Sequence, residues 1–229
     1  MNKIFLMMAS LLLLMASSSY ATPIVGNYYI GGTYNQIYSV TSVGDPVGGG
    51  SIAGSTLNGA SVPFDYCVDL FTDVYASTDY GKSIITNDGT IHYGQTNAGT
   101  INNVGQVAWL LDQYAIRAET NTDLQIALQA AIWAAINGTS KYSLDASYYA
   151  GHNGQDIVND YNTMLGDLNG TTIGNISNYD WITPVDSNGN QYQAQVTLDP
   201  VPEPGTIMLL GAGMLGFAFY GRRRKNSMV

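Results

Sequence analysis

The chain of 229 residues is acidic, with 17 Asp and Glu residues against 8 Lys and Arg residues and a formal net charge of −9. This charge argues against nucleic acid or anionic lipid as a partner, because both would repel it. Cys67 is the only cysteine, so no intrachain disulfide bond can form. The sequence has no phosphate loop, basic patch or Cys/His cluster at metal-ligand spacing, so we expect neither a metal site nor a cofactor.

The N-terminus has the pattern of a secretory signal peptide. Lys3 supplies a positive charge, residues 4–16 are apolar, and Ser19 and Ala21 place small residues at −3 and −1 of a cleavage point after residue 21. The apolar stretch is short for a membrane-spanning helix, which favours cleavage over permanent anchoring. We therefore expect residues 1–21 to be removed on export.

Residues 22–200 are long enough for one domain and form the predicted ectodomain. Three basic residues, Lys82, Arg117 and Lys141, stand against 16 acidic ones in this segment, which gives it a charge of −13. Tyr, Asn, Gly, Ser and Thr are abundant and charges are few. This composition is typical of exported β-rich proteins.

The first half of the ectodomain predicts strands. Residues 24–43 read as two short strands broken by Gly31 and Gly32, and the Gly- and Ser-rich residues 44–61 read as a loop or irregular strands. Residues 64–71 predict a half-buried strand that carries Cys67. Residues 83–86 and 90–93 predict a hairpin, since Asn-Asp-Gly between them tolerates positive φ.

Helical periodicity replaces this pattern from residue 101 onward. Apolar residues recur at helical spacing over 101–118 and again over 122–137, where Thr122 and Gln125 suggest a capping box. A third, weaker helix is predicted over 147–168. Residues 181–185 and 192–198 then predict a closing hairpin. We therefore expect an α+β fold, a β-rich framework with a helical insertion over about residues 101–168.

The C-terminus, residues 201–229, has three successive parts. Pro202, Glu203 and Pro204 come first, and an uncharged, Gly-rich apolar run over 205–221 follows. The third part is a basic cluster over 222–225, formed by Arg222, Arg223, Arg224 and Lys225. A run of this length can span a bilayer, and the cations would keep its end in the cytoplasm. The pattern predicts a membrane anchor with the ectodomain outside.

These three parts, in this order, resemble the PEP-CTERM sorting signal of Gram-negative bacteria. The resemblance implies that an exosortase, a membrane protease, recognises the tail and removes it. The chain would be anchored transiently in the inner membrane and then released to the cell surface or to an exopolysaccharide matrix.

Two short motifs in the ectodomain form a second resemblance. Tyr66-Cys67-Val68 places a cysteine between an aromatic and an apolar residue, and Gln129 opens a Gln-x-Ala-apolar-Trp motif that ends at Trp133. Together they resemble the signature motifs of the bacterial thioester domain of surface adhesins, over about residues 62–140.

This resemblance implies an internal thioester between Cys67 and Gln129, with Tyr66 and Trp133 shielding or positioning the pair. Only a Cys–Gln or Cys–Asn pair can form such a bond, and its carbonyl captures a target amine or hydroxyl once. The expected function is covalent attachment to a surface or matrix target, which is not enzymatic turnover. A permanent clamp between strand and helix would use the same bond.

Two other functions fit the sequence. A cysteine hydrolase would need His92 or His152 as a base beside Cys67, and no known signature supports it. A non-covalent module that binds matrix or carbohydrate would use the abundant Tyr and Trp side chains for stacking, although such residues more often build β cores.

Overall fold

A computed structural model describes residues 23–40, 46–93, 97–168, 173–199 and 213. The chain divides into two compact units, Met1–Asp199 and Pro200–Val229. The predicted signal peptide and, apart from residue 213, the whole predicted sorting tail lie outside the described residues. Within the described part of the chain, no helix is both long enough and apolar enough to cross a membrane.

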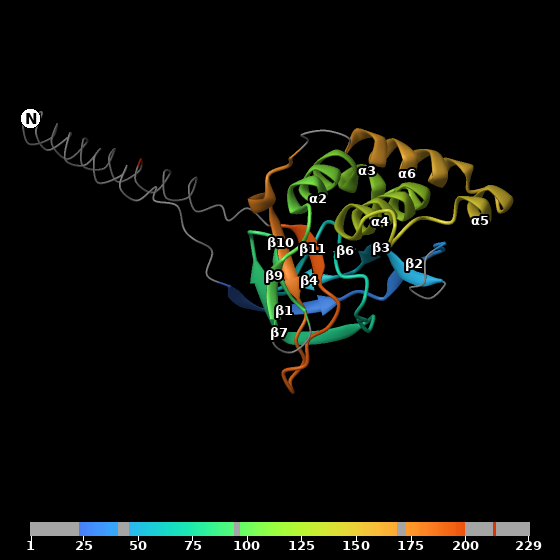
Figure 1. Cartoon of the computed structure of the whole chain (residues 1–229). Coiled ribbons are helices and arrows are strands. Elements are labelled where there is room, and N and C mark those ends of the chain that lie inside the picture. The colour runs from blue at the N-terminus through green and yellow to red at the C-terminus, as the bar shows by residue number, and fades with distance from the viewer. Residues whose placement is uncertain (1–22, 41–45, 94–96, 169–172, 200–212, 214–229) are drawn as a thin grey trace, which may run out of the picture. The chain divides into compact units, whose positions relative to one another are not determined.

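An antiparallel seven-stranded sheet forms the framework of the first unit (Figure 1). Its spatial order is β5-β4-β1-β7-β10-β11-β6. The strands of this sheet have the following bounds: β1 Ile24–Ile30, β4 Thr56–Leu57, β5 Ala60–Ser61, β6 Tyr66–Cys67, β7 Thr78–Thr86, β10 Tyr179–Thr183 and β11 Gln195–Leu198. The closing strands β10 and β11 thus lie beside strands from the beginning of the chain, which is what the order strands, helices, strands predicts.

Two further strand pairs flank this sheet. β2 (Thr33–Ile37) pairs with β3 (Val47–Ala53), and β8 (Thr90–Tyr93) pairs with β9 (Asn97–Thr100). The Gly-rich segment contains β3, whose pairing with β2 shifts register between Thr33 and Asn35 and whose Gly50 has φ +86, so of the two readings, loop or irregular strands, the second is confirmed. The expected hairpin is corrected: β8 pairs with β9 instead of with β7, although Gly89 does turn the chain with φ +82. β7 is occupied on its two edges by β1 and β10, so it has no edge left for β8.

The helices gather on one side of the strands in Figure 1. They have the following bounds: α2 Val104–Leu110, a π-helical turn Leu111–Ala115, α3 Ile116–Ala118, α4 Thr122–Asn137, α5 Ala146–Gly151, α6 Gln155–Asp167 and a 3₁₀ turn Ile176–Asn178. The predicted helical insertion is confirmed. The predicted third helix is two helices, because the chain is interrupted between Gly151 and Gly154.

Helix α4 is the centre of the packing. It contacts α6 and α2 as well as β3 and β2, so 12 of its 16 residues are buried. An Ala-rich helix suits this position, because small side chains let several neighbours approach. The N-cap is Asn121 and not Thr122: the Asn121 side chain accepts a hydrogen bond from the Leu124 N–H at 3.1 Å, and Thr122 is the first helical residue.

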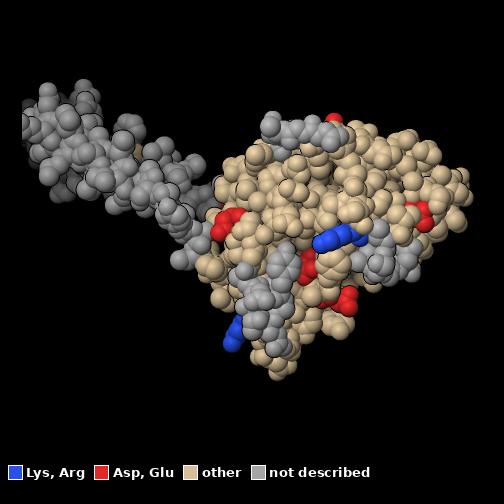
Figure 2. Space-filling view, viewed as in Figure 1, with Lys and Arg blue, Asp and Glu red and all other residues tan. Residues whose placement is uncertain are grey.

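The visible surface carries few charges. Figure 2 shows scattered acidic groups and fewer basic ones on a largely uncharged face. This agrees with the sparse charges of the predicted ectodomain.

Candidate functional site

The motif residues Cys67 and Gln129 meet in the interior of the first unit. Cys67 lies on β6 and carries a free thiol, and Gln129 lies on α4. The Cys67 N–H donates to Gln129 Oε1 at 2.9 Å, and Gln129 Nε2 donates to the Cys67 carbonyl oxygen at 2.7 Å. The side-chain amide of Gln129 is therefore held by both hydrogen-bonding groups of the Cys67 backbone, 62 positions away in the chain.

The sheet explains why these backbone groups are available. β6 is the last strand of the seven-stranded sheet and pairs with β11 on its inner edge, where Val68 donates to Ala194. In an antiparallel ladder, alternate residues turn their N–H and C=O groups to opposite edges. Those of Cys67 face outward. Ile52 of β3 reaches this edge at Asp65, to whose carbonyl oxygen it donates at 2.9 Å, and Gln129 supplies the partners at Cys67.

Gln129 is fully buried. The reason is that α4 is enclosed by helices on one side and by β2 and β3 on the other. A buried amide needs partners for its donors and its acceptor, and the Cys67 backbone supplies them.

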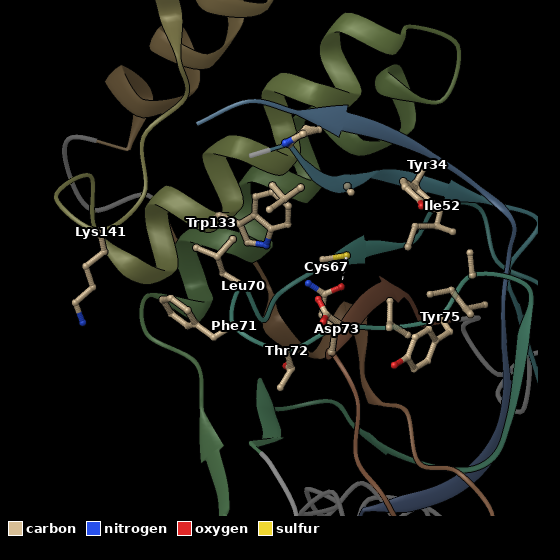
Figure 3. A pocket seen from close by; sticks show the side chains of 18 of the residues that line it. Tyr34, Ile52, Cys67, Leu70, Phe71, Thr72, Asp73, Tyr75, Trp133 and Lys141 are labelled. Atoms are coloured by element: carbon tan, nitrogen blue, oxygen red, sulfur yellow. Dashed lines mark hydrogen bonds between the residues drawn. The ribbon is translucent and has the colours of Figure 1, made fainter. Parts of the chain in front are cut away.

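A cavity of about 1220 Å³ adjoins Cys67, which lies on its wall, whereas Gln129 is not among the lining residues (Figure 3). Trp133 also lines it and is fully buried, one turn after Gln129 on α4. Its indole ring packs edge-on against Tyr142, with ring centroids 5.3 Å apart. Trp133 thus forms a rigid apolar wall next to the two motif residues.

Tyr66 has a different position from Trp133. It is fully buried, but it is not among the cavity-lining residues and packs on Phe64 with ring centroids 5.9 Å apart. Successive residues of a strand point to opposite faces, so a tyrosine next to Cys67 is directed away from the thiol. Any role of Tyr66 in this site would pass through the position of β6.

The thiol itself contacts another glutamine. Cys67 Sγ donates to Gln193 Oε1 at 3.3 Å, and Gln193 also lines the cavity. The residue opposite Cys67 on β11 is Gln195, which is fully buried. Neither Gln193 nor Gln195 belongs to a motif, so neither was predicted as a site residue. The pattern that could have indicated them is Gln at the alternate positions 193 and 195, which puts two amides on one face of the strand predicted over 192–198.

Burial raises the pKa of the Cys67 thiol well above its ordinary value, and the carboxylate of Asp65 adds to this effect. The thiol is therefore protonated at neutral pH. A cysteine hydrolase needs a thiolate made by a neighbouring base. Neither His92 nor His152 is among the residues that line the cavity: the backbone of His92 bonds Thr183, and the His152 ring stacks on Tyr148.

Gly49 on β3 lets the helix reach this site. A Cβ atom at Gly49 would lie 2.8 Å from the Trp133 ring and 2.9 Å from Gln129 Cγ. Real Cβ contacts are longer, so strand β3 and helix α4 pack at this distance only because residue 49 has no side chain.

We expect Gly49→Ala to lower the free energy of unfolding by about 1–3 kcal/mol, because overpacking must displace Gln129 or Trp133. Urea unfolding followed by circular dichroism measures this. Gly81→Ala on β7 is the matched control, since its Cβ would meet nothing within 4 Å. Equal stability of the two variants would contradict the close packing of β3 on α4.

Among the described residues, no group of three or more His, Cys, Asp or Glu side chains is arranged to hold a metal ion. The groups that can react are the protonated thiol of Cys67 and the side-chain amide of Gln129, which is hydrogen-bonded to the Cys67 backbone. Cys67 also lines the cavity.

Comparison with known proteins yields one match. Residues 200–225 match the PEP-CTERM protein-sorting motif. The chain is therefore an exported protein sorted by an exosortase, through processing at the membrane. No curated protein and no solved structure matches the chain.

Proposed function

We propose that this exported protein forms an internal thioester between Cys67 Sγ and the side-chain carbonyl carbon of Gln129, and uses it for covalent attachment outside the cell. The observation that carries the proposal is the pair of hydrogen bonds, 2.9 Å and 2.7 Å, that hold the Gln129 amide on the backbone of Cys67. An amide held on the backbone of Cys67 stays beside the residue whose thiol would attack it, and such confinement lowers the entropy cost of their reaction.

Cys67 and Gln129 supply all the atoms needed to form the thioester and release ammonia. Cys67 Sγ attacks the carbonyl carbon of Gln129, the C–N bond breaks, and the thiol proton leaves with the amide nitrogen as ammonia. The Cys67 N–H that donates to Gln129 Oε1 would stabilise the negative charge that develops on this oxygen during the attack.

The capture step uses the same atoms. A target amine or hydroxyl attacks the acyl carbon, the C–S bond breaks, and the proton of the nucleophile ends on the Cys67 sulfur. The target is then joined to Gln129 by an amide or an ester bond, and Cys67 is again a thiol. The protein reacts once, so it is not an enzyme in the sense of turnover.

Burial of the pair supports a bond that survives until a target arrives. Cys67 and Gln129 are 1% and 0% exposed, and the fully buried Trp133 lines the adjoining cavity. Water is thereby limited at a carbonyl that it would otherwise hydrolyse. The cavity gives a small nucleophile, or the end of a lysine or sugar chain, a route to the sulfur side of the bond.

Peptide-level mass spectrometry on the purified full-length chain tests the proposal. We expect the peptides that contain Cys67 and Gln129 to be joined and lighter by one ammonia. Methylamine should separate them, leave a free thiol at Cys67 and add one methylamine, less ammonia, to Gln129.

Cys67→Ala and Gln129→Ala should each abolish both effects, and Gln125→Ala, on the same helix, should leave them intact. An alkylatable Cys67 together with an unmodified Gln129 in folded wild-type protein would refute the thioester.

A second candidate, non-covalent binding of matrix polysaccharide, rests on the side chains around the cavity. Tyr34, Phe71 and Tyr75 line it and are 51%, 66% and 63% exposed (Figure 3). Exposed aromatic faces suit stacking on sugar rings. Binding to polysaccharide that persists in Cys67→Ala and is lost in Tyr75→Ala would favour this function over capture.

A further inference from the structure

Gln193 accepts the hydrogen bond of the Cys67 thiol, and the proposed steps of thioester formation do not use it. It lies just before β11, is 9% exposed and lines the cavity. Its Oε1 accepts the hydrogen bond of the Cys67 thiol at 3.3 Å, the contact drawn as a dashed line at the labelled Cys67 in Figure 3. The carbonyl oxygen of its side chain thus stands at the place where the cavity meets the sulfur.

The orientation of this amide is fixed by its other contacts. Gln193 Nε2 donates to the Asp69 carbonyl oxygen at 2.6 Å, and the Gln193 backbone N–H donates to the Asp73 carbonyl oxygen at 3.0 Å. A flipped amide would set its oxygen against the Asp69 oxygen, with no proton between them. Gln193 therefore presents an acceptor to the sulfur, and never a donor.

Thioester formation would remove the S–H group of Cys67, which donates a hydrogen bond to Gln193 Oε1. The sulfur of a thioester carries no proton, so Gln193 Oε1 would be left beside it as a largely buried acceptor without that hydrogen bond. An unpaired buried acceptor is unfavourable, and it attracts the next available N–H or O–H group. A nucleophile that approaches the acyl carbon through the cavity passes beside this oxygen and brings such a group.

We propose that Gln193 is the positioning residue for the capture step: its Oε1 accepts a hydrogen bond from the attacking amine or hydroxyl and directs the lone pair of that group at the acyl carbon. As the C–S bond breaks, the proton passes from the nucleophile to the Cys67 sulfur. The product state then regains the hydrogen bond from Cys67 Sγ to Gln193 Oε1 that the structure contains. This inference rests on the proposed thioester.

The assignment predicts which nucleophiles benefit. Amines and hydroxyls have an N–H or O–H to donate, whereas a thiol attacks as a thiolate and has nothing to donate. Gln193 should therefore accelerate capture of methylamine and leave attack by 2-mercaptoethanol unchanged. A purely structural role would change the two rates together.

The experiment compares the full-length wild-type chain with Gln193→Met, which keeps the length of the side chain and removes the amide. Both proteins should show the ammonia-deficient linked peptide. The methylamine rate of the variant should fall about tenfold or more, while its 2-mercaptoethanol rate stays within about twofold of wild type. Gln191→Met, whose position does not line the cavity, is the matched control.

The following results would contradict the role of Gln193 in the capture step. Equal slowing of both nucleophiles, or of neither, would remove Gln193 from the capture step. A folded Gln193→Met chain that does not lose ammonia would assign Gln193 to thioester formation instead. If the wild-type chain itself shows no thioester, the proposed function fails, and this is seen before any Gln193 variant is compared.

Discussion

In a Cys67→Ala background, Gln129→Ala is expected to lower the free energy of unfolding by about 2–5 kcal/mol. The background variant cannot form a thioester, so the difference measures the lost hydrogen bonds and packing of Gln129 without any contribution from the thioester. Without the Gln129 amide, the backbone N–H and C=O of residue 67 are buried at the outer edge of β6 and lose both partners. Each unsatisfied buried group costs about 1–3 kcal/mol.

Gln125→Ala in the same background is the matched control. Gln125 lies one turn earlier on α4 and bonds the Asn35 side chain at 3.0 Å in a part-buried setting, where water can replace a lost bond. We expect it to cost less than about 1 kcal/mol. Urea unfolding of the two double variants decides the matter: a similar loss in both would show that the Gln129 amide does not hold β6.

The second large effect is a loss of stability with rising pH that comes from Asp65. Burial raises the pKa of this carboxyl to about 6, against 3.8 in the unfolded chain, and the hydroxyl of the buried Tyr28 donates to it. Between these two values the folded protein binds a proton that the unfolded chain has released. Stability therefore falls as pH rises from about 4 to 6, and the full cost remains above that window.

A pKa difference of about 2 corresponds to about 3 kcal/mol at most. Asp65→Asn cannot ionise and can still accept from Tyr28, so it should match wild type near pH 4 and exceed it by up to about 3 kcal/mol at pH 8. Burial also raises the pKa of Asp180 to about 7. Because Asp180 is present in both proteins, part of the fall in stability with rising pH should remain in wild type and in Asp65→Asn.

Asp79→Asn removes the same charge from an exposed position on β7 and serves as the control. Urea unfolding at several pH values measures the effect. A pH profile of Asp65→Asn that runs parallel to wild type would mean that Asp65 does not titrate in this window.

The order of elements could be predicted from the sequence, because periodicity changes sharply at residue 101 and again after residue 168. The pairing of strands could not. β8 reads as the second strand of a hairpin, yet both edges of β7 are taken by strands from opposite ends of the chain. The bounds of β3 could not be predicted from its Gly-rich segment, where the approach of α4 requires glycine at position 49 and a φ of +86 favours glycine at position 50.

For the site, the pairing of Cys67 with Gln129 could be predicted because two local motifs point to it. The depth of Gln129 could not, since its burial depends on elements that come from both ends of the helical insertion. Gln193 lies outside both motifs, 126 positions from Cys67. Its contact with the sulfur arises only from the register of β11 on β6, and a register is a long-range property.

The Gln129 amide also has a consequence for how molecules of this protein behave toward one another. A strand at the border of a sheet, with free N–H and C=O groups, is a template on which another chain can add, and this leads to aggregation. β6 is two residues long, and a side chain fills the Cys67 position on its outer border. Helix α4, through Gln129, and strand β3, through Ile52, therefore cover this border and keep it from other chains. A variant that loses Gln129 holds the covering helix less firmly, so we expect it to aggregate more readily as well as to lose its chemistry.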